Sequence, residues 1–273
     1  MKIIKRRLNL LISEREKTLV GLLFKFDKSK ISKLKLLDPK FIIKYLSSNY
    51  LIPALYLKLK KLKLTHLFEN DFIIYIKKIY SINKSRNEQL IIESRSISKL
   101  FNLHKIEFSF LKGSALLKSN IYEIGERMIG DIDILVSKDQ AKKAHKLLRK
   151  SGYNSKNEYL FWKTRHLPRL INPNKIFAVE IHTELIYYPK RKLLDPISVL
   201  KNSKKNIPDI KDLIKHCIYN DQINNFGFRK ASFSLRSLMD YHKMKIFSLK
   251  KFNFNDRYFN KFILITNLFG ISN

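Results

Sequence analysis

Cysteine is nearly absent from the 273-residue sequence, which contains only Cys217. A single cysteine forms no disulfide within the chain, and this excludes the small secreted proteins that depend on several disulfides. Cys217 has apolar neighbours in a predicted helix, so we interpret it as a core residue and not as a nucleophile. The cysteine content fits a reducing compartment, and we expect a cytoplasmic protein.

Long hydrophobic runs are missing as well. No segment reaches the roughly 18 consecutive apolar residues that a membrane-spanning helix requires. The apolar stretch 8–12 near the start of the chain precedes Glu14 and is too short for the hydrophobic part of a signal peptide. The sequence therefore predicts no membrane span.

Acidic residues are scarce, since 23 Asp and Glu stand against 55 Lys and Arg and the net charge is +32. Such a charge attracts polyanions, so nucleic acid is a candidate partner. Only 13 of the 55 basic residues are arginines, however, and the lysines are scattered along the chain. Phosphate-binding surfaces favour the forked guanidinium of arginine, and a lysine-rich composition is also typical of an AT-rich genome. The charge alone therefore does not identify a partner.

Glycine is also rare, and four of its seven occurrences lie between residues 113 and 152. Backbone freedom is thus concentrated in one segment, which also contains the strand patterns. Alternating apolar residues over 106–111 predict a strand that stops at residues 112–114, and a short helix is expected over 115–120. Residues 131–136 predict a second strand and residues 138–150 an amphipathic helix closed by Gly152. Residues 176–185 predict a third strand.

Helical spacing dominates the rest of the chain. It runs over residues 19–103 and is clearest in 86–103, where apolar residues recur on one face and Glu93 and Ser94 lie elsewhere. Two more helices are expected after Pro208. We therefore predict an α+β fold in which a small mixed β-sheet is flanked by helical regions. The predicted regions are a helical N-terminal one at 1–104, the sheet core at 105–190 and a helical C-terminal one at 191–273.

Three acidic residues in the strand region point to a metal site. Asp131 and Asp133 are two apart on a strand and project from the same face, while Ile132 and Ile134 face the core. Carboxylates this close repel each other unless a divalent cation lies between them, and Mg²⁺ prefers oxygen ligands. Glu180 faces away from the apolar side of the third strand and can complete a trio of carboxylates around two metal ions. Without a metal, these residues would be a solvated strand end and an exposed strand glutamate.

A small turn near these carboxylates is suited to phosphate. The backbone amides of Gly113 and Ser114 and the serine hydroxyl can hold phosphate oxygens. Lys112 directly precedes this turn. Arg127 can bind phosphate or pair with a nearby carboxylate.

Several other residues are weaker candidates, each with a plain alternative. His182 shares a strand face with the third carboxylate, where it can orient that group or an acceptor molecule, or simply pack. The basic cluster at 165–169, which includes His166, can meet a triphosphate or an acceptor, although a solvated loop is the simpler interpretation. Arg236 and Asp240 are one helical turn apart, and an ion pair between them is expected.

The order of these motifs resembles the signature of DNA polymerase β-type nucleotidyltransferases, and more narrowly the uncharacterised bacterial nucleotidyltransferase family. The matching segments are Arg86-Asn87, Phe110–Leu116, Arg127 with Gly130–Val136, Gly152-Tyr153 and Val179–His182. The resemblance covers about residues 86–185 well and extends more loosely to the helical stretch 235–241. The first 80 residues match only in their helical character. The sequence departs from the family pattern at Thr183, where the family usually has tryptophan. It also departs in the helix predicted directly after Pro208, where the expected histidines are reduced to His216.

The resemblance implies a Mg²⁺-dependent enzyme that acts on an NTP. Asp131 and Asp133 would bind two catalytic Mg²⁺ ions, and Glu180 would be a third ligand or the general base. The nucleotide phosphates would be held by Lys112, Gly113, Ser114 and Arg127. An acceptor hydroxyl would attack the α-phosphorus and pyrophosphate would leave. The acceptor stays open between a small molecule, a tRNA end and a partner protein.

Two other functions are consistent with the sequence. A basic nucleic-acid-binding protein would bind in a strongly salt-dependent way and would not need Mg²⁺. A nucleotide-binding protein of the same fold would lack catalysis altogether. The absence of a recognisable RNA- or DNA-binding motif argues against the first, and the intact set of three carboxylates argues against the second.

Overall fold

The computed structural model describes residues 13–155, 165–230, 232–249, 252 and 254–268. The apolar stretch 8–12 lies outside these residues. The described part of the chain opens with the helices α2 (Glu14–Phe24), α3 (Ile31–Lys35), α4 (Pro39–Ser48) and α5 (Ile52–Lys61), followed by the long helix α6 (Asn70–Leu103). Helix starts follow the usual chemistry: Asp38 accepts a hydrogen bond from the Lys40 amide and Pro39 occupies the first helical position of α4. The described residues of the N-terminal part are therefore helical, as the sequence predicts.

A three-stranded mixed sheet follows, which confirms the predicted α+β fold. Its strands are β1 (Phe108–Phe110), β2 (Asp131–Val136) and β3 (Ala178–His182), in the order β1-β2-β3. β1 pairs antiparallel with β2, and β2 pairs parallel with β3. Helix α7 (Lys112–Lys118) lies between β1 and β2 in the chain, and α8 (Lys138–Lys150) between β2 and β3. The second strand and α8 have the predicted bounds.

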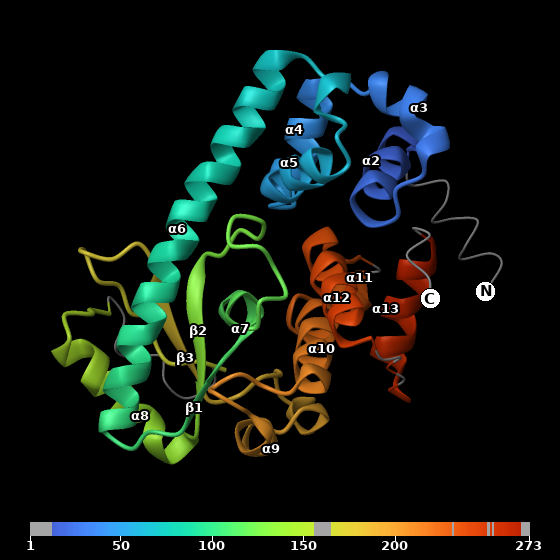
Figure 1. Ribbon diagram of the computed structural model, residues 1–273. Helices are drawn as coiled ribbons and strands as arrows, with labels where there is room; N and C mark the ends of the chain where they lie inside the picture. Colours follow the sequence, from blue (N-terminus) through green and yellow to red (C-terminus); the bar gives the residue numbers. More distant parts are fainter. Residues whose placement is uncertain (1–12, 156–164, 231, 250–251, 253, 269–273) are drawn as a thin grey trace.

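The two faces of this sheet differ in polarity. Ile132, Ile134, Val179 and Ile181 are fully buried on one face. This face lies toward α6, whose Arg86 guanidinium stands 5.4 Å from the centre of the Phe177 ring. The other face presents the acidic residues. In Figure 1, α6 extends from the N-terminal helices at one end to the sheet and α8 at the other.

The C-terminal part is helical. It contains α9 (Pro196–Asn202), α10 (Ile210–Tyr219), α11 (Gly227–Lys230), α12 (Leu235–Ser248) and α13 (Arg257–Leu268). One π-helical turn, η4 (Asn220–Asn224), directly follows α10. α10 packs against α7 and α12, so the C-terminal helices lie on the polar side of the sheet (Figure 1).

The structure adds a segment that periodicity did not predict. Residues 165–171 run antiparallel to β3 and bond to it through the Leu167 amide to the Ile181 carbonyl (2.8 Å) and the Leu170 amide to the Val179 carbonyl (2.9 Å). The free edge of β3 is thus covered. This pairing places the basic residues of the segment beside the acidic face of the sheet.

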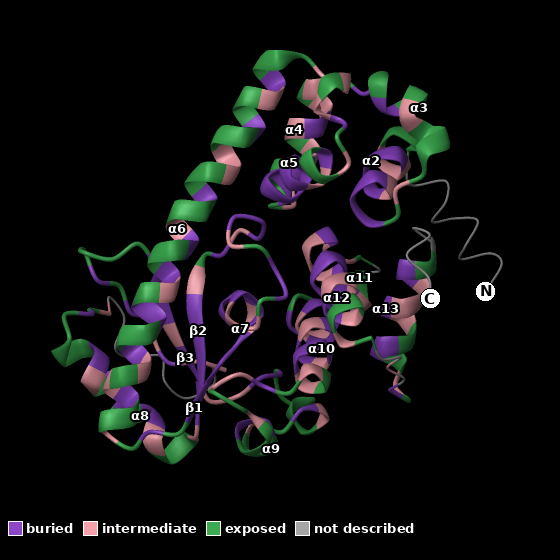
Figure 2. Ribbon diagram, in the orientation of Figure 1, coloured by how far each residue is buried: buried purple, intermediate pink, exposed green. Residues whose placement is uncertain are grey.

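Burial corrects one detail of the predicted helix 86–103. The sequence pattern predicts Glu93 and Ser94 away from the apolar face, yet both are buried. Figure 2 shows buried residues recurring between exposed ones along α6. Glu93 accepts a hydrogen bond from the Tyr153 hydroxyl, which follows α8 in the chain. Helix α8 and the residues after it therefore cover a side of α6 that the sequence pattern leaves polar.

Within the described residues, none of the helices combines the length and the apolar character that crossing a membrane would require.

Candidate active site

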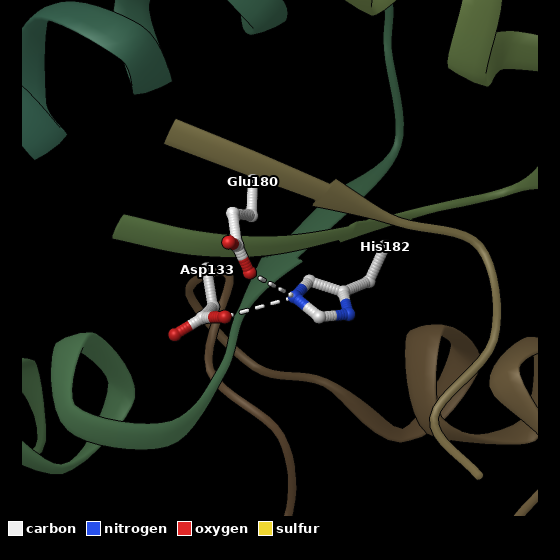
Figure 3. A group of neighbouring side chains, drawn as sticks. All are labelled: Asp133, Glu180 and His182. Atoms are coloured by element: carbon white, nitrogen blue, oxygen red, sulfur yellow. Dashed lines mark hydrogen bonds and ion pairs between the residues drawn. The ribbon is translucent and has the colours of Figure 1, made fainter. Parts of the chain in front are cut away.

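The parallel pairing of β2 and β3 places three chemically active side chains together. Asp133 lies directly opposite Glu180 in the register, and His182 is two residues further along the same face. The His182 Nε2 atom lies 2.8 Å from Asp133 Oδ1 and 3.6 Å from Glu180 Oε2. One ligand atom from each residue falls within 4.8 Å of the other two (Figure 3). This cluster has the geometry of a cation site.

Asp133 is ionised despite its burial. Burial by itself would raise the pKa of this carboxyl, but the Lys112 ammonium and the His182 ring outweigh burial and hold the pKa well below its usual range. The Lys112 Nζ atom lies 2.5 Å from Asp133 Oδ1. Asp133 therefore presents a buried negative charge that is balanced by an amine.

The pKa values of Glu180 and Asp131 are shifted in opposite directions. The nearby His182 ring lowers the pKa of Glu180, against the effect of burial. Burial raises the pKa of Asp131, and the ion pair with Arg169 offsets this only in part. Asp131 is the more exposed aspartate and lies at the start of β2. Of the predicted trio, the structure thus brings Asp133 and Glu180 together and leaves Asp131 at the rim, bound to Arg169.

His182, for which the sequence left open the orientation of Glu180, contact with the acceptor and simple packing, is the third member of the cluster. Its ring is fully buried, and the centre of the His166 ring lies 5.1 Å away. The segment 165–169 was interpreted most simply as a solvated loop, and this was wrong: Arg169 pairs with Asp131, and the Arg165 guanidinium lies 4.5 Å from the centre of the Tyr187 ring. The long-range pairing with β3, which no local pattern reveals, causes the difference.

The phosphate-binding candidates open helix α7. Gly113 and Ser114 form part of its first turn rather than a separate turn before it. The Ser114 side chain is fully buried, and its hydroxyl lies 3.4 Å from the Asp131 carbonyl oxygen. A Cβ atom on Gly113 would collide with the Arg127 Nη1 atom. Glycine is therefore required here because the Arg127 side chain crosses the start of α7.

The sequence leaves two roles open for Arg127, phosphate binding and pairing with a carboxylate, and the structure shows the pairing. Its Nε and Nη2 atoms each lie 2.7 Å from an oxygen of Asp240 on α12, and both side chains are buried. The Tyr122 hydroxyl also donates to Asp240 (2.7 Å). The expected ion pair of Asp240 with Arg236 was therefore wrong. Arg236 instead lies over the Tyr50 ring, 5.0 Å from its centre.

Two buried asparagines on α6 hold the loop that contains Arg127. The Asn83 amide donates to the Gly125 and Arg127 carbonyls at 2.9 and 3.1 Å, and the Asn87 amide donates to the Arg127 carbonyl at 2.9 Å. Asn87 belongs to the Arg-Asn pair on which the family resemblance rested. Asn83, one turn earlier, was missed, because a buried asparagine in a long helix has no distinctive spacing.

The residues present fit a divalent cation. Asp133, Glu180 and Asp131 offer carboxylate oxygens, which Mg²⁺ prefers. The His182 nitrogen either orients Asp133 or acts as a ligand, and a nitrogen ligand favours a transition metal such as Mn²⁺ over Mg²⁺. The Lys112 ammonium already lies at Asp133, so the site stabilises positive charge at this position. A cation would have to compete with that amine.

Comparison with known proteins agrees with this geometry. A search of curated proteins found no match. A family model described as an uncharacterised nucleotidyltransferase matches residues 36–245, which include α4 to α8, the whole sheet and most of α12. The match extends well beyond the residues 86–185 that the resemblance covers well, and it includes the stretch 235–241 and residues 36–85 of the N-terminal helical part. Because it spans most of the 273 residues, the chain belongs to the uncharacterised nucleotidyltransferase family.

Proposed function

We propose that the protein transfers a nucleoside monophosphate from an NTP to an acceptor hydroxyl in a Mg²⁺-dependent reaction that releases pyrophosphate. Family membership supports nucleotidyl transfer and a nucleotide substrate. The observation that carries the metal dependence is the convergence of Asp133, Glu180 and His182 on one face of the sheet. The order of the carboxylates on β2 and β3 also supports our placement of the chain in the DNA polymerase β superfamily.

Each residue of the site has a proposed part. Asp131, Asp133 and Glu180 would hold one or two Mg²⁺ ions, and His182 would fix the orientation of the Asp133 carboxylate through its Nε2 atom. An ion held by these residues would supply positive charge for the phosphate oxygens during the transfer. For Asp131 to bind a metal ion, its ion pair with Arg169 must break. The exposed Arg169 side chain would then contact the phosphates instead.

The reaction itself is an in-line displacement. The acceptor oxygen forms a bond to the α-phosphorus while the bond from that phosphorus to the β-bridging oxygen breaks, and the electron pair leaves with pyrophosphate. The acceptor proton passes to a carboxylate, for which Glu180 is our candidate. Gly113 and Ser114 would contact the phosphates. Arg127, already bound to Asp240, would position α7 rather than touch the nucleotide.

The acceptor side of the site would be formed by nearby basic residues and by the helices around the sheet. His166 lies against His182 and is our candidate for contact with the acceptor. A small molecule, a tRNA end and a partner protein all present suitable hydroxyl groups.

The test is label transfer from α-labelled NTPs to a cell extract, together with measurement of pyrophosphate release. We expect Mg²⁺-dependent transfer by the wild type and a loss of more than about 100-fold in Asp133→Asn, since even indirect partners of a metal contribute 10–100-fold. Asp139→Asn makes the same change at an exposed position in α8 and should leave transfer unchanged. Transfer that survives Asp133→Asn would rule out the proposed site.

A further inference from the structure

A polar pocket lies beside the cation cluster, between α7, α10 and the first turns of α12. Its lining includes Lys112, which also pairs with Asp133, so the pocket adjoins the cluster directly. α10 contacts both α7 and α12 (Figure 1). The π-helical turn η4 contributes Asn220 to the same pocket. Such turns inside helices are frequent at functional sites.

The charge of the lining is positive. Lys112, Arg127 and Arg236 face a single carboxylate, Asp240. Both oxygens of Asp240 are bound by Arg127, so the Arg236 guanidinium has no carboxylate partner among the described residues. Burial, and then the nearby charge of Arg127, lowers the pKa of Arg236. The pocket thus holds a partly buried cation whose charge an anion would balance.

A second, independent feature points to a ligand. His216 on α10 lines the pocket and is only 4% exposed, yet its Nε2 atom has no hydrogen-bond partner among the described residues. Burial, with the charges of Lys112 and His182, lowers the pKa of His216 to about 3. A buried polar atom without a partner is unfavourable. A neutral imidazole can still donate its N–H to a phosphate oxygen.

The neutral part of the lining is suited to the same kind of ligand. Asn220, Asn225, Ser234 and Ser237 also line the pocket. Amide and hydroxyl groups can donate to several oxygens at once, and the forked guanidinium of arginine binds phosphate in a bidentate way. A carboxylate ligand, with two oxygens, would use fewer of these donors.

We propose that this pocket binds a phosphate group of a substrate, with Arg236 and His216 as its ligands and Lys112 shared between the phosphate and Asp133. The identity of the substrate rests on the proposed nucleotidyl transfer. The phosphate is either the β,γ end of the NTP or a phosphate on the acceptor. Both have the same chemistry, and both would lie next to the cation cluster.

The experiment is calorimetric titration of the full-length protein with tripolyphosphate in buffer free of divalent ions. We expect the wild type to bind one tripolyphosphate and Arg236→Gln to weaken binding by about tenfold or more, as loss of a charge-assisted hydrogen bond implies. Arg229→Gln removes the same charge from an exposed position on α11 and should change the affinity less than about twofold. The control separates the pocket from the general positive charge of the protein.

A second pair of variants tests the buried histidine. His216→Leu should weaken tripolyphosphate binding about fivefold, whereas His216→Gln keeps an N–H donor and should retain most of it. Arg236 is only partly buried, so its variant remains informative even if the His216 variants unfold. Unchanged binding by Arg236→Gln, or no binding by the wild type, would overturn the proposal.

The outcomes are distinct from those that test catalysis. Asp133→Asn should abolish transfer but still bind tripolyphosphate, because it removes a negative charge beside the pocket. Competition between tripolyphosphate and the NTP would assign the pocket to the nucleotide phosphates. Simultaneous binding would assign it to a phosphorylated acceptor, and both results support the pocket.

Discussion

Glu93 shows how a single buried residue links the pH of the solvent to stability. It lies on α6 with only 3% of its surface exposed and accepts a hydrogen bond of 2.5 Å from Tyr153. Burial raises the pKa of Glu93, and the bond with Tyr153 offsets this only in part. The protonated form is therefore favoured in the folded protein relative to the unfolded chain.

The raised pKa of Glu93 fixes the direction in which its contribution to stability changes with pH. The contribution of Glu93 is fully present below the pKa of the unfolded chain and is lost as the pH rises through the folded pKa. Glutamine cannot ionise, so we expect the free energy of unfolding of Glu93→Gln to rise relative to that of the wild type as the pH increases from 4 to 7. Urea unfolding at both values measures this. Glu88→Gln, on the exposed side of the same helix, is the control, and an equal difference at both pH values for Glu93→Gln would contradict the prediction.

Lys112 makes a second prediction at the residue scale. Its ammonium lies at Asp133, where a divalent cation would bind in our proposal. Lys112→Gln should therefore tighten Mn²⁺ binding by about tenfold while it weakens tripolyphosphate binding, because a competing positive charge is removed from one site and a ligand from the other. Lys118→Gln at the other end of α7 is the matched control. Calorimetry with each ligand gives both affinities, and a parallel loss of both would show that Lys112 only supports the fold.

Three helices, α6, α7 and α12, meet at the loop that contains Arg127. The loop that contains it is held by Asn83 and Asn87 of α6, its side chain crosses Gly113 of α7, and its guanidinium binds Asp240 of α12. The ion pair between Arg127 and Asp240 joins the sheet region to the C-terminal helices. Its rigidity fixes the start of α7, and therefore Lys112, relative to the carboxylates of β2.

Breaking this pair should be costly. Arg127→Met leaves the buried Asp240 carboxylate without its arginine and with the Tyr122 hydroxyl as its remaining donor among the described residues, and we expect a loss of about 3–5 kcal/mol in the free energy of unfolding. The double variant Arg127→Met/Asp240→Leu should recover most of it, since both charges are removed together. Lys17→Met, which breaks an exposed pair with Glu14, should change stability by less than about 1 kcal/mol. Denaturant unfolding provides the comparison, and a double variant as unstable as the single one would refute this explanation.

At the scale of the whole molecule, the charge of +32 is the dominant property. Scattered lysines attract any polyanion without a specific geometry. We expect a short RNA to bind weakly, with an affinity that falls steeply with salt, by about 10³-fold between 50 and 200 mM if some six phosphates are contacted.

The same titration separates this binding from the active site. Asp133→Asn should bind RNA as the wild type does, and Mg²⁺ should not be needed. RNA binding that requires Mg²⁺ or resists salt would instead indicate an RNA acceptor in the site. Fluorescence anisotropy over a salt series distinguishes the two.

Local patterns in the sequence determined the elements of this protein. The apolar residues that follow each aspartate in 131–136 predict β2 with its observed bounds, and every residue of this strand after Asp131 is buried. The alternation of side chains along a strand puts Asp131 and Asp133 on one face and Glu180 on the polar side of β3. The helical spacing over 138–150 likewise defines α8, and Gly113 and Gly125 mark places where the backbone approaches the Arg127 and Tyr80 side chains closely.

Only the tertiary structure decided which of these residues meet. The β2–β3 register sets Asp133 opposite Glu180 and adds His182, while Asp131 is drawn to Arg169 on a segment with no regular pattern. Arg127 finds Asp240 more than a hundred residues away, against the local pairing of Asp240 with Arg236. Periodicity reports which side of an element is apolar, but the partner of a charged group depends on how elements pack, and burial strengthens a distant pair far beyond an exposed neighbour.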